Sequence, residues 1–83
     1  MDTIPRVRSV LVCGPAMLRV RFENGAERLY DCTAIFSLPQ FQLLKTLAFF
    51  RAVRVDPGGY GISWNDDMDL SESELWTNGK PCE

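Results

Sequence analysis

The dipeptide Asn24-Gly25 constrains this chain most, because it joins two segments in which apolar and polar residues alternate. Asn-Gly tolerates the positive φ angles of a two-residue type I′ turn and is a strong hairpin signal. Before it, Leu18, Val20 and Phe22 alternate with Arg19, Arg21 and Glu23. The pattern predicts a strand with one face in a core, paired with a return strand over residues 26–31.

A two-residue loop fixes the pairing of this hairpin. It places Val20 opposite Leu29, with both side chains in the core, and Arg21 opposite Arg28. Like charges facing each other are destabilising, so we expect a counter-charge from residues 66–74 or from a partner. The face away from the core would then carry Arg19, Arg21, Arg28 and Tyr30.

Three further segments have strand patterns. Residues 6–13 are β-branched and apolar and end at a Gly-Pro turn. Residues 52–55 and 60–64 flank Asp56-Pro57-Gly58-Gly59, which predicts a second hairpin. In that hairpin Val53 would face Ile62, Val55 would face Tyr60, and Arg51 would stack on Trp64 as a cation–π pair.

Short helices are expected in two regions. Pro39 precedes a helix-prone stretch over residues 40–44, and Thr46 can cap a second helix over residues 47–51. Ser71 and Glu74 have the spacing of a capping box, which predicts a helix through Trp76. Residues 31–36 are interpreted as a connecting turn.

The chain of 83 residues is expected to form one domain, with a core over about residues 5–78 and a tail at 79–83. The predicted fold class is α+β: a small antiparallel sheet of four to five strands, built from two hairpins and packed with two to three short helices. No apolar stretch is long enough to cross a bilayer and no signal-peptide pattern begins the chain, so a cytoplasmic protein is expected.

The residue types give little support to catalysis. There is no histidine, which removes Ser-His and Cys-His nucleophile pairs and most catalytic zinc sites. The three cysteines lie far apart, which is neither a disulfide framework nor a zinc pattern. Asp66, Asp67 and Asp69 are weak candidates for a metal site, although Leu70 stands where a calcium loop requires glycine. We predict no cofactor and no catalytic residue.

Charge is distributed unevenly along the chain. Residues 1–54 hold eight Lys and Arg against four Asp and Glu, whereas residues 55–83 hold one against seven. The two parts can pair within the fold, or the basic part can bind a partner. The isoelectric point near 5.0 opposes general affinity for nucleic acid, so direct binding to DNA is the less favoured interpretation.

The middle of the chain has more apolar residues than one short helix face can bury. Most should enter the core, and one or two left outside would form a docking patch. Phe49 and Phe50 are the candidates there, and they join Arg19, Arg21, Arg28 and Tyr30 as the predicted partner-binding residues.

Three segments together resemble the bacterial family catalogued as Domain of Unknown Function 2442. They are the Phe-x-x-Gly hairpin of residues 22–25 that ends at Asp31, the stretch from Leu44 through Phe50 and Val53, and the ending from Trp64 through Asp69-Leu70 to Leu75. The family usually has glycine at the position of Asp67. The resemblance spans about residues 5–76 and implies a compact α+β fold with no established activity. It also implies association with helix-turn-helix domains, or with a small protein encoded next door in a toxin–antitoxin arrangement.

The leading hypothesis is a non-enzymatic protein–protein interaction or regulatory domain, such as the antitoxin-like half of a two-gene module. Its partner would be another small protein encoded next door, and a homodimer through a sheet edge is compatible with it. A DNA-binding or transcription-linked module is the alternative. A metal-dependent hydrolase using the three aspartates is the second alternative.

Overall fold

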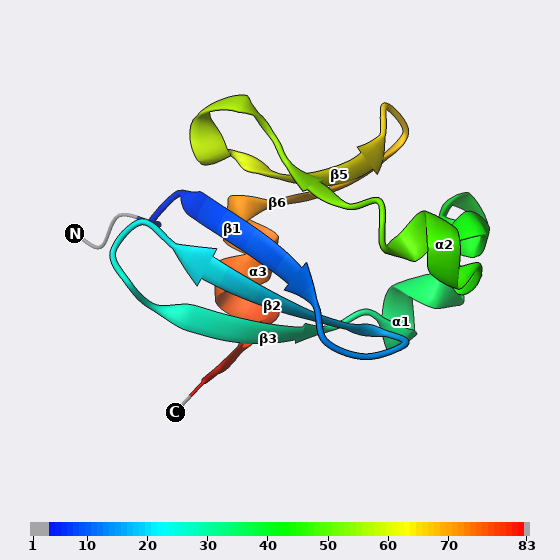
Figure 1. Ribbon diagram of the computed structural model, residues 1–83, viewed down its shortest axis with the longest axis horizontal. Helices are drawn as coiled ribbons and strands as arrows, with labels where there is room; N and C mark the ends of the chain where they lie inside the picture. Colours follow the sequence, from blue (N-terminus) through cyan, green and yellow to red (C-terminus); the bar gives the residue numbers. More distant parts are fainter. Residues whose placement is uncertain (1–3, 83) are drawn as a thin grey trace.

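The computed structural model describes residues 4–82 and contains two antiparallel sheets and several short helices (Figure 1). The α+β prediction is confirmed. One sheet has the strand order β1-β2-β3-β7 and the other β4-β5-β6. The strands are β1 (Val7–Val12), β2 (Met17–Phe22), β3 (Glu27–Asp31), β4 (Arg54–Val55), β5 (Gly61–Asn65), β6 (Met68–Ser71) and β7 (Lys80–Pro81).

The helices are short and lie at two places. The helices α1 (Thr33–Phe36), η1 (Pro39–Lys45, a 3-10 helix) and α2 (Leu47–Phe50) follow one another at one end of the molecule, and α3 (Glu72–Asn78) lies behind β1–β3 in Figure 1. Another 3-10 turn, η2 (Pro57–Gly59), joins β4 to β5. Among the described residues, no helix is long and apolar enough to span a membrane.

The helix ends match the sequence signals in part. The Ser71 hydroxyl accepts a hydrogen bond from the Glu74 amide at 3.1 Å, which is one of the two hydrogen bonds of a capping box. Thr46 stands at the start of α2, but its side chain makes no capping hydrogen bond there. The interpretation of residues 31–36 as a simple turn is wrong, because Asp31 accepts hydrogen bonds from the backbone and hydroxyl of Thr33 and α1 begins there.

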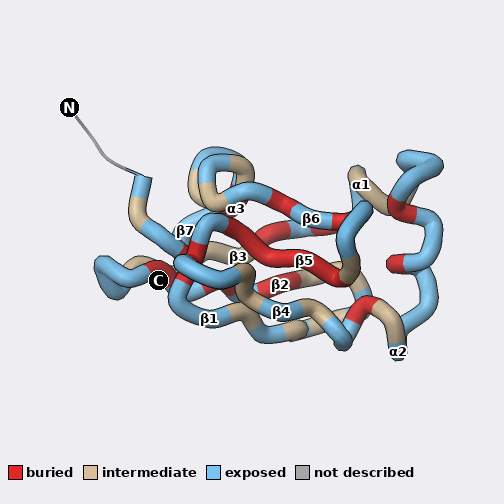
Figure 2. Tube along the Cα trace, turned by 90° about the horizontal axis from the view of Figure 1, so that it is seen from above, coloured by how far each residue is buried: buried red, intermediate tan, exposed pale blue. Residues whose placement is uncertain are grey.

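The core lies between the two sheets and α3, and Phe41, Leu44 and Phe50 of η1 and α2 extend it at the helical end of the molecule. Figure 2 shows β5 as a nearly continuous buried strand. The buried aromatic rings meet edge to face or stacked: Phe50 lies 5.6 Å from Phe36 and 6.0 Å from Trp64, measured between ring centroids. Gly59 brings the second hairpin against β1, since a Cβ there would lie 2.5 Å from the Val7 carbonyl oxygen.

The first hairpin has a different register from the predicted one. Its loop holds three residues, because the Phe22 amide donates to the Ala26 carbonyl at 2.8 Å and Gly25 alone takes a positive φ, of 88°. A three-residue loop with glycine in the left-handed region produces a one-residue bulge. Arg21 therefore lies opposite Glu27, and Val20 lies opposite Arg28. The predicted Arg21–Arg28 and Val20–Leu29 pairs do not form.

The second hairpin is also shifted. Val55 pairs with Ile62, not with Tyr60. The Asp56 amide donates to the Gly61 carbonyl at 2.9 Å, so the loop spans residues 57–60 and not 56–59. Trp64 is buried against Phe50, and its indole nitrogen donates to the Phe50 carbonyl at 2.9 Å. The predicted stacking of Arg51 on Trp64 is therefore wrong.

Two strands had no place in the prediction. After β5, the Asn65 side chain accepts hydrogen bonds from the amides of Asp67 and Met68, and this turn leads into β6. At the other end, β7 pairs with β3, and the Cys82 amide donates to the Glu27 carbonyl at 3.0 Å. Residues 80 and 81 thus belong to the sheet and Cys82 is hydrogen-bonded to it, so these residues are not a free tail, while Glu83 lies outside the described residues.

Candidate functional site

The candidate site is the face of the first sheet that points away from the core. We call it the outer patch. Residues directly opposite each other on antiparallel strands project from the same face. Arg19 lies opposite Leu11 of β1 and Leu29 of β3, and Arg21 lies opposite Glu27. The outer patch consists of Leu11, Arg19, Arg21, Glu27 and Leu29.

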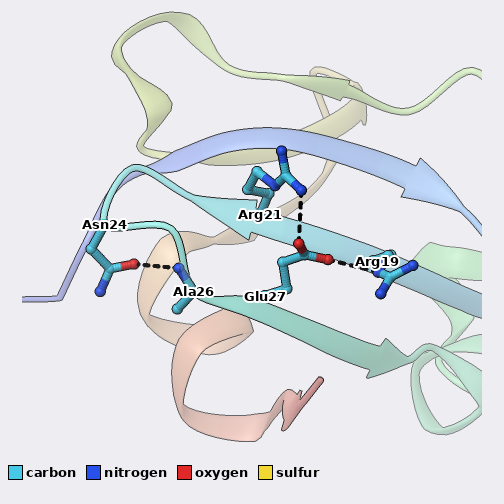
Figure 3. Close-up of polar contacts among 5 residues, drawn as sticks. All are labelled: Arg19, Arg21, Asn24, Ala26 and Glu27. Atoms are coloured by element: carbon cyan, nitrogen blue, oxygen red, sulfur yellow. Dashed lines mark hydrogen bonds and ion pairs between the residues drawn. The ribbon is translucent and has the colours of Figure 1, made fainter. Parts of the chain in front are cut away.

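Glu27 holds both arginines of the outer patch (Figure 3). One carboxylate oxygen lies 2.8 Å from Nε of Arg19, and the other lies 2.8 Å from Nη2 of Arg21. The hydrogen bond from Arg21 lowers the pKa of Glu27, and the charge of Arg19 acts in the same direction. The counter-charge expected from residues 66–74 or from a partner thus comes from the neighbouring strand.

The outer patch keeps a net positive charge. Two guanidinium groups face one carboxylate, and the arginine side chains remain 51% and 54% exposed. Leu11 is 63% exposed beside them. Because α3 packs on the opposite side of this sheet, no helix of residues 4–82 covers the patch (Figure 1). The arrangement offers cationic hydrogen-bond donors and an aliphatic side chain on a rigid surface.

Arg28 and Tyr30 do not join the outer patch. The one-residue shift in register turns both toward the inner face. The Arg28 guanidinium lies 3.9 Å from the ring centroid of Trp76, and the buried Tyr30 donates its hydroxyl to Glu74 at 2.7 Å. The prediction that these two side chains share a face with Arg19 and Arg21 is wrong.

The two phenylalanines proposed as a docking patch are not surface residues of that kind. Phe50 is fully buried, and Phe49 is partly buried against the core. The exposed apolar residues of the helical end are leucines instead: Leu38, Leu43 and Leu47. An excess of apolar residues was visible in the sequence, but which of them lie outside depends on how η1 and α2 pack.

The three aspartates proposed as weak metal candidates do not form a ligand set. Asp66 and Asp67 occupy the β5–β6 turn, and Asp69 is an exposed residue of β6. Within residues 4–82, no three His, Cys, Asp or Glu side chains are grouped closely enough to hold a metal ion. Each of the three cysteines is a free thiol, and only Cys32 is buried.

Sequence reasoning missed three residues of the outer patch. Leu29 was expected in the core, and the shifted register places it beside Arg19 instead. Glu27 was not singled out, although its position just after an Asn-Gly turn placed it near the start of the return strand. Leu11 was counted only as an apolar residue of a strand, but β1 has a bulge between Val7 and Ser9, and beyond it Leu11 shares a face with Arg19.

The elements described above follow one another in an order that a known sequence family shares: a hairpin with a three-residue loop, a helical middle, and the segment β5–β6–α3. The family model described as "Protein of unknown function (DUF2442)" matches residues 7–81. The chain belongs to this family. The match covers every described strand and helix, from β1 to β7. No curated protein and no solved structure shows a significant match to the chain.

Proposed function

We propose that this DUF2442 domain is a non-enzymatic interaction domain that binds another protein through the outer patch. The observation that carries the proposal is the pair of half-exposed arginines that Glu27 holds in place on the uncovered face of a sheet. Arginine is enriched at protein interfaces because its planar guanidinium donates several hydrogen bonds in a fixed geometry. A side chain already positioned by a neighbour loses less conformational entropy when a partner binds.

The charge of the patch defines the partner's surface. Arg19 and Arg21 carry one more positive charge than Glu27 neutralises. A complementary partner therefore presents carboxylates, with an apolar group to cover Leu11. The partner is proposed to be the small protein encoded next to this one, with the present chain as the regulatory or antitoxin-like half of a cytoplasmic pair.

Co-expression tests this proposal directly. The chain and the product of the neighbouring gene are produced together and separated by size-exclusion chromatography at about 50 mM salt, where screening of surface charges is weak. We expect one peak that contains both proteins. Two separately eluting proteins would contradict the proposal.

The same preparation separates the competing hypotheses. Static light scattering of the isolated chain gives its mass, and a dimer that persists in place of the complex would replace the proposal by self-association. A gel shift with duplex DNA at low salt that disappears by 200 mM salt would favour the DNA-binding alternative instead.

A further inference from the structure

A pocket of about 320 Å³ lies at the end of β3, separate from the arginines of the outer patch. It forms there because β7 pairs only with Arg28 and Leu29, so Tyr30 and Asp31 extend beyond the end of β7. α3 and α1 close its other sides, through Glu74 and Ala34 among others. The volume is at the lower end of the range of small-molecule sites.

Glu74 gives the pocket its charge. One oxygen of its carboxylate accepts the Tyr30 hydroxyl at 2.7 Å, which fixes the group at the wall of the pocket. Among the described residues, no Lys or Arg nitrogen lies within 4.0 Å of this carboxylate. The negative charge of Glu74 is therefore not neutralised by an ion pair within the part of the chain that the structure describes.

The other two charged residues of the pocket compensate each other. Hydrogen bonds from Thr33 lower the pKa of Asp31, and the positive charge of Lys80 lowers it further. Asp31 and Lys80 both line the pocket. With one lysine against two carboxylates, the lining carries one net negative charge, and it lies with Glu74.

The remaining walls are suited to an aliphatic chain. Met17, Leu29 and Ala34 line the pocket beside the carboxamide of Asn78. A small cation with an apolar stem could place its head group at Glu74, donate a second hydrogen bond to the Asn78 oxygen, and bury its methylene groups against the apolar wall.

We propose that this pocket binds an ammonium or guanidinium group carried on a short aliphatic stem, with Glu74 as its counter-ion. The group could come from a free small amine or from a Lys or Arg side chain of a bound protein. Leu29 belongs to both the pocket and the outer patch, so a side chain of a partner on the patch is within reach. The proposal does not depend on the proposed function.

Titration of the ¹⁵N-labelled full chain tests it, with amide chemical shifts as the readout. The probe is n-butylammonium chloride at constant ionic strength, and n-butanol is the neutral control of similar shape. We expect saturable shifts at Leu29, Asp31 and Asn78 with butylammonium, with a dissociation constant on the order of 1 to 10 mM for so small a ligand. Butanol should leave these amides nearly unshifted.

A pair of variants isolates the charge of Glu74. Glu74→Gln keeps an acceptor for the Tyr30 hydroxyl and should weaken butylammonium binding at least about 10-fold, the loss expected for one charge-assisted hydrogen bond. Glu23→Gln removes a carboxylate from the exposed hairpin loop and should leave the binding unchanged. Equal shifts with butanol, or full affinity in Glu74→Gln, would overturn the proposal. The butanol comparison needs only the wild-type chain.

The source of the cation is decided with a capped Gly-Lys-Gly peptide. Shifts at the same three amides would assign the pocket to a lysine side chain of a protein, and shifts with butylammonium alone would assign it to a free amine. Neither measurement involves the protein partner or Arg19 and Arg21. Failure of the pocket proposal is thus distinct from failure of the proposed function.

Discussion

The two faces of the β2–β3 ribbon differ sharply in what their residues do. On the inner face Leu18, Val20 and Phe22 have no exposed surface. On the outer face Arg19 and Arg21, which alternate with them along the same strand, are about half exposed and bound by one glutamate. The inner face therefore holds the fold together, whereas the outer face can change with little effect on folding. This separation leaves the outer face free for recognition.

Removal of the Phe22 ring should have the largest effect on the stability of the fold, because the ring packs on the inner face. Phe22 is fully buried and meets Trp76 edge to face at 5.0 Å between ring centroids. Phe22→Ala should lower the free energy of unfolding by about 3 to 5 kcal/mol, the usual range for loss of a buried phenylalanine. Urea unfolding followed by tryptophan fluorescence measures it. A loss below about 1 kcal/mol would show that the inner face is not packed as described.

The inner face should also make the fold sensitive to high pH. Cys32 continues this face beyond β3, and burial raises the pKa of its thiol from 9.0 to about 12, with a smaller effect of the Asp31 charge. The folded state therefore keeps the thiol protonated where the unfolded chain ionises. The contribution is complete below pH 9 and is lost as the pH rises toward 12.

At pH 10.5 the loss attributable to Cys32 should be about 1 to 2 kcal/mol relative to pH 8. Urea unfolding of the wild type and of Cys32→Ala at both pH values measures it, with Cys13→Ala as the exposed control. The wild type and Cys13→Ala should lose more stability than Cys32→Ala. Equal losses in all three proteins would contradict the burial of Cys32.

The hydroxyl of Tyr30 should contribute less than the Phe22 ring. Tyr30→Phe keeps the buried ring and removes the hydrogen bond to Glu74, so we expect a loss of about 1 kcal/mol at pH 7. Tyr60→Phe is a matched control, since Tyr60 is 54% exposed. Chemical denaturation of the two variants tests the difference, and an equal effect would contradict a stabilising hydrogen bond between Tyr30 and Glu74.

The smallest effect on stability is expected on the outer face. The pKa of Glu27 is lowered from 4.5, so its ion pairs stabilise the fold above that pH and are lost as the pH falls through the folded-state pKa. Glu27→Gln should therefore be slightly less stable than the wild type at pH 7, and the difference should shrink at pH 3.5. A difference that grows on acidification would contradict the ion pairs with Arg19 and Arg21.

The sequence was sufficient for the elements that carry a strong local signal and insufficient for their pairing. Asn24-Gly25 located the hairpin, and Ser71 with Glu74 located α3, because both signals act within a few residues. The register depended on whether Asn24 also takes a positive φ, and among the described residues only glycines do. That single torsion angle decided that Tyr30 lies inside and Leu29 outside.

Long-range contacts limited the rest of the prediction. β6 was hidden because Met68 and Leu70 alternate with acidic residues that indicated a turn or a metal loop. β7 has two residues and exists only through its pairing with β3. The alternation of apolar and polar residues was sufficient to predict that Arg19 and Arg21 are exposed. The ion pairs of Glu27 and the pocket at Glu74 could not be predicted in this way, because they depend on which strands and helices pack together.

Calorimetric titration of the protein encoded next door into the chain and two charge-reversal variants tests the central claim most directly. Arg19→Glu/Arg21→Glu changes the outer patch, and Arg51→Glu/Arg54→Glu makes the same change of charge at exposed arginines elsewhere. We expect the first variant to bind on the order of 100-fold more weakly, about 2.8 kcal/mol, because binding hot spots are enriched in arginine and the loss of one hot-spot residue costs about 2 kcal/mol or more. The second should bind within a few fold of the wild type. Equal weakening in both, or none in the first, would contradict recognition through the outer patch.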